Sequence, residues 1–249
     1  MLYGFLFQCR EPLSIRETDS PLNRFRRVFA ISCLGLSFFV HTETQAQTFA
    51  DVAESHWAYQ FIESLAASGI SAGCGGGNYC PDGPVTRAQM AVFLERGMNG
   101  SGFVPSPATG AVFSDVDAGT FAANFIEKLA ADGITSGCGG GNYCPDATVT
   151  RDQMAVFLLR AKYGSGYSPP SPAGVFGDVP TDYWAAAWIE QLAAEGITSG
   201  CGGGDYCPAD PVNRDQMAVF LVRTFSLPIV VPGQTLIWDE GNWDGADWE

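Results

Sequence analysis

Basic residues are scarce in this chain. The sequence holds 13 lysines and arginines against 27 aspartates and glutamates, and its formal net charge is −14. From residue 47 onward the balance is 8 basic to 23 acidic residues. Proteins that bind nucleic acids depend on basic contacts to phosphate, so we expect no nucleic acid partner. The excess of acid favours solubility and says little about the fold.

Histidine is also rare. Beyond residue 46 the sequence has a single histidine, His56, and no nucleophile recurs together with a base. Paired carboxylates can cleave glycosides, but the many acids of this chain make that signal unspecific. The loops lack the alternating oxygen ligands of a calcium-binding EF-hand. We therefore predict that the protein is not an enzyme, and we expect no cofactor and no metal site.

Long hydrophobic runs are missing as well. The longest, VFAISCLGLSFFV, has 13 residues, whereas a helix that crosses a bilayer needs about 20. Basic RFRR precedes this run, and HTETQA follows it with small residues suited to cleavage after Ala46. The pattern is typical of a secretion signal, so residues 1–46 are interpreted as an N-terminal extension and signal peptide. A membrane anchor is the alternative; we expect none in the mature chain.

One ten-residue string occurs twice without change. GCGGGNYCPD occupies residues 73–82 and 137–146, and GCGGGDYCPAD follows at 200–210. Internal repeats indicate architecture more strongly than chain length does. The period predicts three units at residues 48–98, 112–162 and 175–225, joined by Pro-rich linkers at 99–111 and 163–174. An acidic, Trp-containing tail follows at 226–249. The linkers resemble each other, which suggests that they pack against the units.

Each unit keeps its own pair of cysteines. In an exported protein an even number of regularly paired cysteines usually forms disulfides. Zinc is the alternative, but each loop offers two thiols and no histidine where four ligands are needed. No lysine follows the glycines as in a phosphate-binding loop. Glycine permits the tight turns that a short ring requires. We therefore predict the disulfides Cys74–Cys80, Cys138–Cys144 and Cys201–Cys207.

Helical patterns flank every loop. The segments HWAYQFIESLAASGI, TFAANFIEKLAADGI and YWAAAWIEQLAAEGI each carry one apolar stripe. We expect these helices to end at Gly69, Gly133 and Gly196. After the loops, the capping-box pattern of Thr86 with Gln89 and of Thr150 with Gln153 marks the start of a second helix, and Asn213 can cap the third copy. The chain is therefore predicted to be mainly α-helical, with three helix-loop-helix units stacked around a shared core.

The frame FADV, HWA, FIESLAASGISAG and YCPDGPVTRAQMAVFLER resembles the S-layer homology domain, and the second and third units fit equally well. The resemblance covers residues 48–223. It implies a pseudo-threefold helical bundle of three repeats that holds exported proteins on cell-wall polysaccharide, often pyruvylated, through grooves between neighbouring repeats. The resemblance implies the glycan-binding residues Arg87, Arg151, Arg214, Trp57 and Trp184. We add Thr86 and Thr150, the threonines of the first two TR motifs.

This chain departs from the family pattern at three places. Glutamine replaces the usual glutamate at Gln89, Gln153 and Gln216, the loops carry cysteine pairs, and Phe121 replaces tryptophan in the middle repeat. The loss of a charge and the added cysteines leave the identity of the glycan open. We expect a protein that is secreted and associated with the cell wall or cell surface. Another envelope protein, bound through the acidic surface or the tryptophans of the tail, is the alternative partner.

The first-turn arginines suggest an anionic ligand on physical grounds too. Free amides and the helix dipole at a helix N-terminus favour negative charge, and a guanidinium can hold a carboxylate with two bonds. A solvated side chain or an inter-repeat salt bridge is the alternative role of these arginines. Asp152 and Asp215 would repel an anion next to their arginines, whereas the first repeat has Ala88, so we expect the groove at Arg87 to bind most tightly.

Two further groups of residues allow more than one interpretation. The tryptophans Trp57 and Trp184 could stack on sugars, although aromatic residues at helical spacing are more often buried in the core. Asp51, Asp115 and Asp178 are expected to hold a turn or to cap the first helix of each unit.

Overall fold

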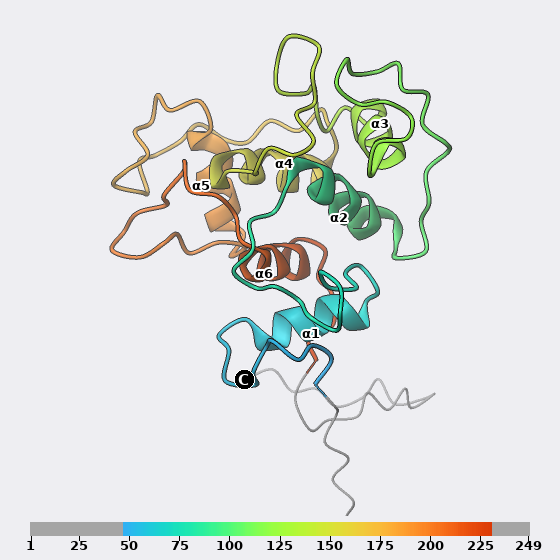
Figure 1. Cartoon of the computed structure of the whole chain (residues 1–249). Helices are drawn as coiled ribbons and strands as arrows, with labels where there is room; N and C mark the ends of the chain where they lie inside the picture. The colour runs from blue at the N-terminus through green and yellow to red at the C-terminus, as the bar shows by residue number, and fades with distance from the viewer. Residues whose placement is uncertain (1–46, 231–249) are drawn as a thin grey trace, which may run out of the picture. The chain divides into compact units, whose positions relative to one another are not determined.

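The computed structural model describes residues 47–230. The predicted signal segment and the acidic stretch from residue 231 onward lie outside this range. Within it the chain forms six α-helices, with no β-strand beyond isolated bridges (Figure 1). None of these helices has the length and apolarity that a bilayer crossing requires. The helices are α1 (Tyr59–Ala67), α2 (Arg87–Asn99), α3 (Ala123–Ala131), α4 (Arg151–Tyr163), α5 (Ala186–Ala194) and α6 (Arg214–Thr224).

The helices pair between repeats. In the described range α1 packs on α6, α3 packs on α2 and α5 packs on α4, while α2, α4 and α6 contact one another (Figure 1). The two helices of one repeat, by contrast, do not pack on each other in the described range. Each repeat therefore lends its first helix to the second helix of the preceding repeat, and repeat 1 closes the circle on repeat 3. The predicted mainly α, three-repeat fold is confirmed, with this exchange of helices as the addition.

A ring of three backbone hydrogen bonds joins the repeats where α2, α4 and α6 begin. The N–H of Val85 donates to the carbonyl of Val212, Val212 donates to Val149, and Val149 donates back to Val85, at 2.9 to 3.0 Å. All three valines are fully buried. Because a ring of this kind needs all three members, it links the repeats cyclically instead of in a row.

The first amides of each second helix also bond to a neighbouring repeat. In α2, the N–H groups of Arg87 and Ala88 donate to the carbonyls of Ala147 and Pro145, both at 2.9 Å. The starts of α4 and α6 bond in the same way to the loops of repeats 3 and 1. The expectation of free N-terminal amides was therefore wrong, because protein carbonyls already occupy them.

The predicted disulfides are present in all three loops, with Cα–Cα distances of 6.0 to 6.1 Å. Since the sulfurs of each pair are bonded to each other, the zinc interpretation does not hold. A carboxylate also holds each loop through hydrogen bonds to backbone N–H groups. Asp115 accepts the N–H groups of Tyr143 and Cys144, both at 2.7 Å, and these bonds lower its pKa although burial alone would raise it.

Asp51 and Asp178 form the same pair of bonds in repeats 1 and 3. These three aspartates were expected to hold a turn or cap a helix; instead they hold the disulfide loop, 28 and 29 residues further along the chain.

The helix ends follow the prediction in part. Gly69, Gly133 and Gly196 have φ angles of +68° to +72° just after α1, α3 and α5, as expected for helix-ending glycines. The capping box of Thr86 and Gln89 is confirmed. The box predicted at Thr150 is wrong, because its hydroxyl donates to Asp152 instead of accepting an amide.

Glutamates of the first helices hold the segments that precede them. The carboxylate of Glu127 on α3 accepts the N–H groups of Thr109 and Gly110 at 2.8 and 2.7 Å, so the linker lies against its helix as expected. On α1, Glu63 accepts the N–H of Thr48 at 3.1 Å. The next residue of α1, Ser64, accepts the N–H of Val230 at 2.8 Å. Both ends of the described chain are therefore attached to α1.

Candidate functional site

Three pockets lie between the repeats, with volumes of about 490, 380 and 200 Å³. Each combines a first-turn arginine of one repeat, the glycine loop and second helix of the next repeat, and an aromatic residue of the third. We name each pocket after its first-turn arginine. Each pocket also contains an arginine from the last turn of the second helix. The Arg87 pocket has Arg160 and Trp184, the Arg151 pocket has Arg223 and Trp57, and the Arg214 pocket has Arg96 and Phe121.

The first-turn arginines are buried, with 4 to 5% of their surface exposed. In the Arg87 pocket, the guanidinium lies over the ring of Tyr143 at 4.7 Å, and its Nε donates to the Tyr143 carbonyl at 2.7 Å. The Tyr143 hydroxyl donates in turn to the carbonyl of Arg87 at 2.8 Å. Arg151 with Tyr206, and Arg214 with Tyr79, repeat this arrangement. These arginines therefore join neighbouring repeats as well as lining the pockets.

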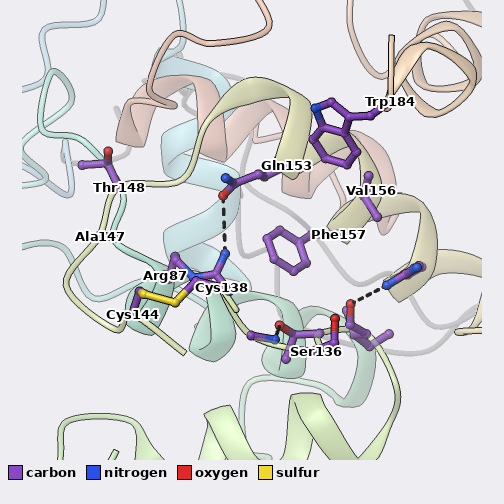
Figure 2. A pocket seen from close by; sticks show the side chains of 14 residues that line it. Arg87, Ser136, Cys138, Cys144, Ala147, Thr148, Gln153, Val156, Phe157 and Trp184 are labelled. Carbon is purple, nitrogen blue, oxygen red and sulfur yellow. Dashed lines mark hydrogen bonds between the residues drawn. A yellow bond between two sulfur atoms is a disulfide. The ribbon is translucent and has the colours of Figure 1, made fainter. Parts of the chain in front are cut away.

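The guanidiniums are not fully bonded. Nη1 of Arg87 reaches Gln153 at 3.4 Å, a contact drawn in Figure 2. Nη2 of Arg87 and Nη2 of Arg151 are buried and have no hydrogen-bond partner in the described structure. Burial lowers the pKa of Arg87. An unpaired donor on a buried cation is costly, and an incoming acceptor would relieve that cost.

The second arginine of each pocket comes from the last turn of the second helix. In the Arg87 pocket, Arg160 donates through Nη1 to the Ile134 carbonyl at 3.3 Å and lies 5.5 Å from the ring of Trp188 on α5. Sequence reasoning missed this residue and its equivalents Arg96 and Arg223. The signal was available, because the three copies of the QMAVFL motif end in LER, LLR and LVR.

The pockets are cationic in an acidic protein. Of the described residues that line them, none is Asp or Glu. The ion pairs found between residues 47 and 230 involve lysines and His56, and none of the arginines in this range. The alternative role of the first-turn arginines, inter-repeat ion pairing, is therefore not what the structure shows.

The predicted aromatic residues lie at the pocket rims. Trp57 and Trp184 are 61% and 59% exposed, so the interpretation that these tryptophans are buried in the core is wrong, and Phe121 is 67% exposed. They precede α1, α3 and α5 and lie outside the apolar stripes. In Figure 2 the indole of Trp184 is at one end of the Arg87 pocket, with Phe157 between it and Arg87. Exposed aromatic faces beside cations can accommodate the apolar face of a sugar ring.

The two first-turn aspartates bond to these tryptophans. Oδ2 of Asp152 accepts the indole N–H of Trp184 at 3.2 Å, and Oδ2 of Asp215 accepts that of Trp57 at 3.0 Å. Neither aspartate lines a pocket. Burial raises the pKa of Asp215. That Asp152 repels an anion from the neighbouring Arg151 stays a prediction; its carboxylate bonds to the tryptophan of the Arg87 pocket.

The remaining predicted residues lie elsewhere. The hydroxyls of Thr86 and Thr150 bond within the first turns of α2 and α4, and neither threonine lines a pocket. The disulfide Cys138–Cys144 borders the Arg87 pocket, as Figure 2 shows. The structure thus brings the predicted arginines and tryptophans together, but always from different repeats.

The described residues form a closed ring of three helical repeats with a cationic, aromatic pocket at each junction, which defines a repeat protein of the closed type. The profile of the S-layer homology domain matches residues 48–91, 112–155 and 175–218. These matches cover more than half of the sequence, and the chain belongs to the S-layer homology domain family.

Relatives with several different names share this region. The chain is 28% identical to the surface-layer 125 kDa protein of Lysinibacillus sphaericus over 81% of its own length and 17% of that protein. It is 30% identical to the cellulosome-anchoring protein of Acetivibrio thermocellus over 60% of this chain and 32% of the relative. It is 29% identical to the amylopullulanase of Thermoanaerobacterium thermosulfurigenes over 70% of this chain and 9% of that enzyme.

The chain thus spans at most about a third of the length of these relatives. Family membership and the surface-layer relatives indicate that the protein is associated with the cell surface.

Proposed function

We propose that the chain attaches noncovalently to an anionic polysaccharide of the cell envelope through its inter-repeat pockets, and that it carries out no catalysis. One observation carries the proposal. Each pocket brings together two guanidiniums from different repeats and an exposed aromatic ring, without a carboxylate among its described lining residues. In a chain with a net charge of −14, pockets whose described lining has cations and no carboxylate favour an anionic ligand.

The chemistry of the pocket favours a carboxylate-bearing sugar. A buried guanidinium with an unpaired Nη2, as in Arg87, is stabilised most by an anionic acceptor that also fits the planar group. The ring of Trp184 offers a flat apolar surface at the pocket rim. A pyruvylated sugar carries both features, a ring face and a carboxylate, and matches the expectation from the family. We propose this class as the ligand.

The cellulosome-anchoring and surface-layer relatives agree with an anchoring role. The enzymes among the relatives share a region that covers only a small part of their length. We therefore assign to this chain the attachment alone.

Binding to purified cell envelopes tests the proposal. The double variant Arg160→Gln and Arg223→Gln removes one cation from each of the Arg87 and Arg151 pockets and leaves the buried first-turn arginines in place. We expect retention on the envelopes to fall by about tenfold or more, as for the loss of charge-assisted hydrogen bonds.

The matched control is Lys162→Gln, which removes a positive charge two residues from Arg160. Lys162 pairs with Glu195 at 2.8 Å and lines none of the three pockets. Its retention should equal that of the wild type. Equal losses in both variants, or undiminished binding to envelopes stripped of polysaccharide, would contradict the proposal. The second result would instead favour an envelope protein as the partner.

A further inference from the structure

We infer that the Arg87 and Arg151 pockets bind the anionic sugar and the Arg214 pocket does not, with Asp152 and Asp215 as the positioning residues that make the difference. This inference rests on the proposed function and deepens it. Three observations distinguish the pockets: the support of the aromatic residue, the bonding of the guanidinium, and the room available.

The aromatic residue is fixed in two pockets and unsupported in the third. Asp152 holds the indole of Trp184, and Asp215 holds the indole of Trp57. At the equivalent place in the third pocket, the helix has Ala88 and the aromatic residue is Phe121, which has no N–H to donate. The acid is thus present where a tryptophan needs an acceptor and absent where it does not. A ring held in one orientation loses less conformational freedom when a ligand binds.

The first-turn arginine has an unpaired nitrogen in the same two pockets. Nη2 of Arg87 and of Arg151 is buried and unpaired within the described structure. Nη2 of Arg214 instead donates to the hydroxyl of Ser71 at 3.5 Å. In the third pocket the Ser71 hydroxyl already accepts a bond from this nitrogen, whereas Nη2 of Arg87 and of Arg151 has no acceptor in the described structure.

The volumes follow the same order. The Arg87 pocket measures about 490 Å³, the Arg151 pocket about 380 Å³ and the Arg214 pocket about 200 Å³. Cavities that bury small ligands usually measure about 300 to 1,000 Å³. Two pockets fall within this range, and the third falls below it.

The two aspartates are absent from the described lining residues of these pockets. Both are buried, with 7% and 6% of their surface exposed. Asp215 accepts bonds from the Trp57 indole at 3.0 Å and from the Gln216 backbone N–H at 2.6 Å. Asp152 accepts bonds from the Tyr183 hydroxyl at 2.7 Å and the Gln153 amide at 2.7 Å, besides the indole. These donors stabilise the carboxylate of Asp152 behind the tryptophan, and the face of the indole stays available to the sugar.

The test uses the full-length chain labelled with 5-fluorotryptophan. The ¹⁹F resonances of Trp57 and Trp184 are assigned with the variants Trp57→Phe and Trp184→Phe. A pyruvylated wall oligosaccharide is the probe, and the same oligosaccharide without its pyruvate is the negative control. We expect calorimetry to give two binding sites per chain, and both resonances to shift on binding.

The variant Asp152→Ala introduces the residue that repeat 1 has at this place. We expect it to move the Trp184 resonance in the free protein and to weaken binding at that pocket by about tenfold, since an anchoring charged hydrogen bond is lost. Asp146→Ala is the matched control, because Asp146 is an exposed acid of the same repeat that lines no pocket. Asp146→Ala should change neither the Trp184 resonance of the free protein nor the affinity of the Arg87 pocket.

A gain of function completes the test. The double variant Ala88→Asp with Phe121→Trp should support a third indole and raise the number of sites from two toward three. Three sites in the wild type, or an Asp152→Ala variant that behaves like Asp146→Ala, would overturn the inference. If the oligosaccharide does not bind at all, the proposed function fails. In that case the ligand-free shift of Trp184 still decides whether Asp152 positions the indole, and an unmoved resonance would overturn the positioning role.

Discussion

Glu95 is an acid in a position that is apolar in the other repeats. It lies on α2 where repeats 2 and 3 have Leu159 and Val222, and it is fully buried. Its Oε2 accepts a bond from Asn99 at 3.1 Å, whereas Oε1 has no partner in the described structure. Burial, together with the nearby carboxylate of Asp132, raises its pKa to about 7. The acid therefore costs stability whenever it is ionised.

This shift makes the stability of the protein depend on pH. An unfolded glutamate has a pKa of about 4.3. The folded chain holds the proton of Glu95 more tightly than the unfolded chain does. The stability that this protonation contributes is therefore complete below pH ~4 and is lost as the pH rises to about 7. The variant Glu95→Leu, which copies repeat 2, should raise the free energy of unfolding at pH 8 by about 1–3 kcal/mol.

Urea unfolding at pH 4.5 and pH 8 measures the effect. The gain should be smaller at pH 4.5, where the wild-type residue is protonated. Glu54→Leu serves as the control, because Glu54 is exposed. A gain that is the same at both pH values would rule out the buried charge as its cause.

Single residues also show what the sequence could and could not predict. The motif placed Arg87, Arg151 and Arg214 at the helix starts, and resemblance assigned them to the binding grooves. Their burial under tyrosines of the next repeat was not predictable, because the contacts span 55, 56 and 135 residues. The exposure of Trp57 and Trp184 was missed for a local reason: α1 and α5 begin two residues after these tryptophans, which therefore lie off the helical stripe.

At the scale of elements, the disulfide loop has several independent supports. In repeat 2 the loop is held by Cys138–Cys144, by the two bonds to Asp115, and by the hydroxyl of Tyr143 bonded to α2. The disulfide is therefore one of three attachments.

Removal of this disulfide should weaken the protein without unfolding it. For the double variant Cys138→Ala and Cys144→Ala, we expect the free energy of unfolding to fall by about 2 kcal/mol, the chain-entropy contribution of so short a ring. The remaining bonds of Asp115 should preserve the loop. Urea unfolding followed by circular dichroism measures the loss. Asp115→Ala with the disulfide intact is the comparison, and a variant without helical signal would contradict this account.

The elements themselves were largely predictable, and their partners were not. Apolar periodicity, capping residues and glycines gave six helices and their approximate ends. The partner of each helix depends on long-range packing, to which local patterns are blind. The sequence pattern of one repeat is the same whether α1 folds back on α2 or, as here, packs on α6 of another repeat.

At the scale of the whole molecule, the exchange of helices makes the repeats depend on one another. Without repeat 3, α1 would lose α6, and the first amides of α4 would lose the carbonyls of Asp210 and Pro208. The valine ring would lose Val212. Linear repeat arrays tolerate the loss of an end unit, because each unit contacts only its neighbours.

We therefore expect a chain truncated after residue 174 to lack cooperative unfolding and most of its helical signal. A chain truncated after residue 230 should unfold like the full-length protein, and it serves as the control. Thermal denaturation followed by circular dichroism compares them. A cooperative transition with about two-thirds of the helical signal would show that the repeats are independent, as in an array.

The attachment of both ends of the described range to α1 has a consequence for fusions to this module. Thr48 is bonded to Glu63 and Val230 to Ser64, so the polypeptide enters and leaves at adjacent residues of one helix. A cargo fused directly ahead of residue 47 or directly behind residue 230 would start beside the same helix. Fusions in either order would therefore join the module at the same helix, α1.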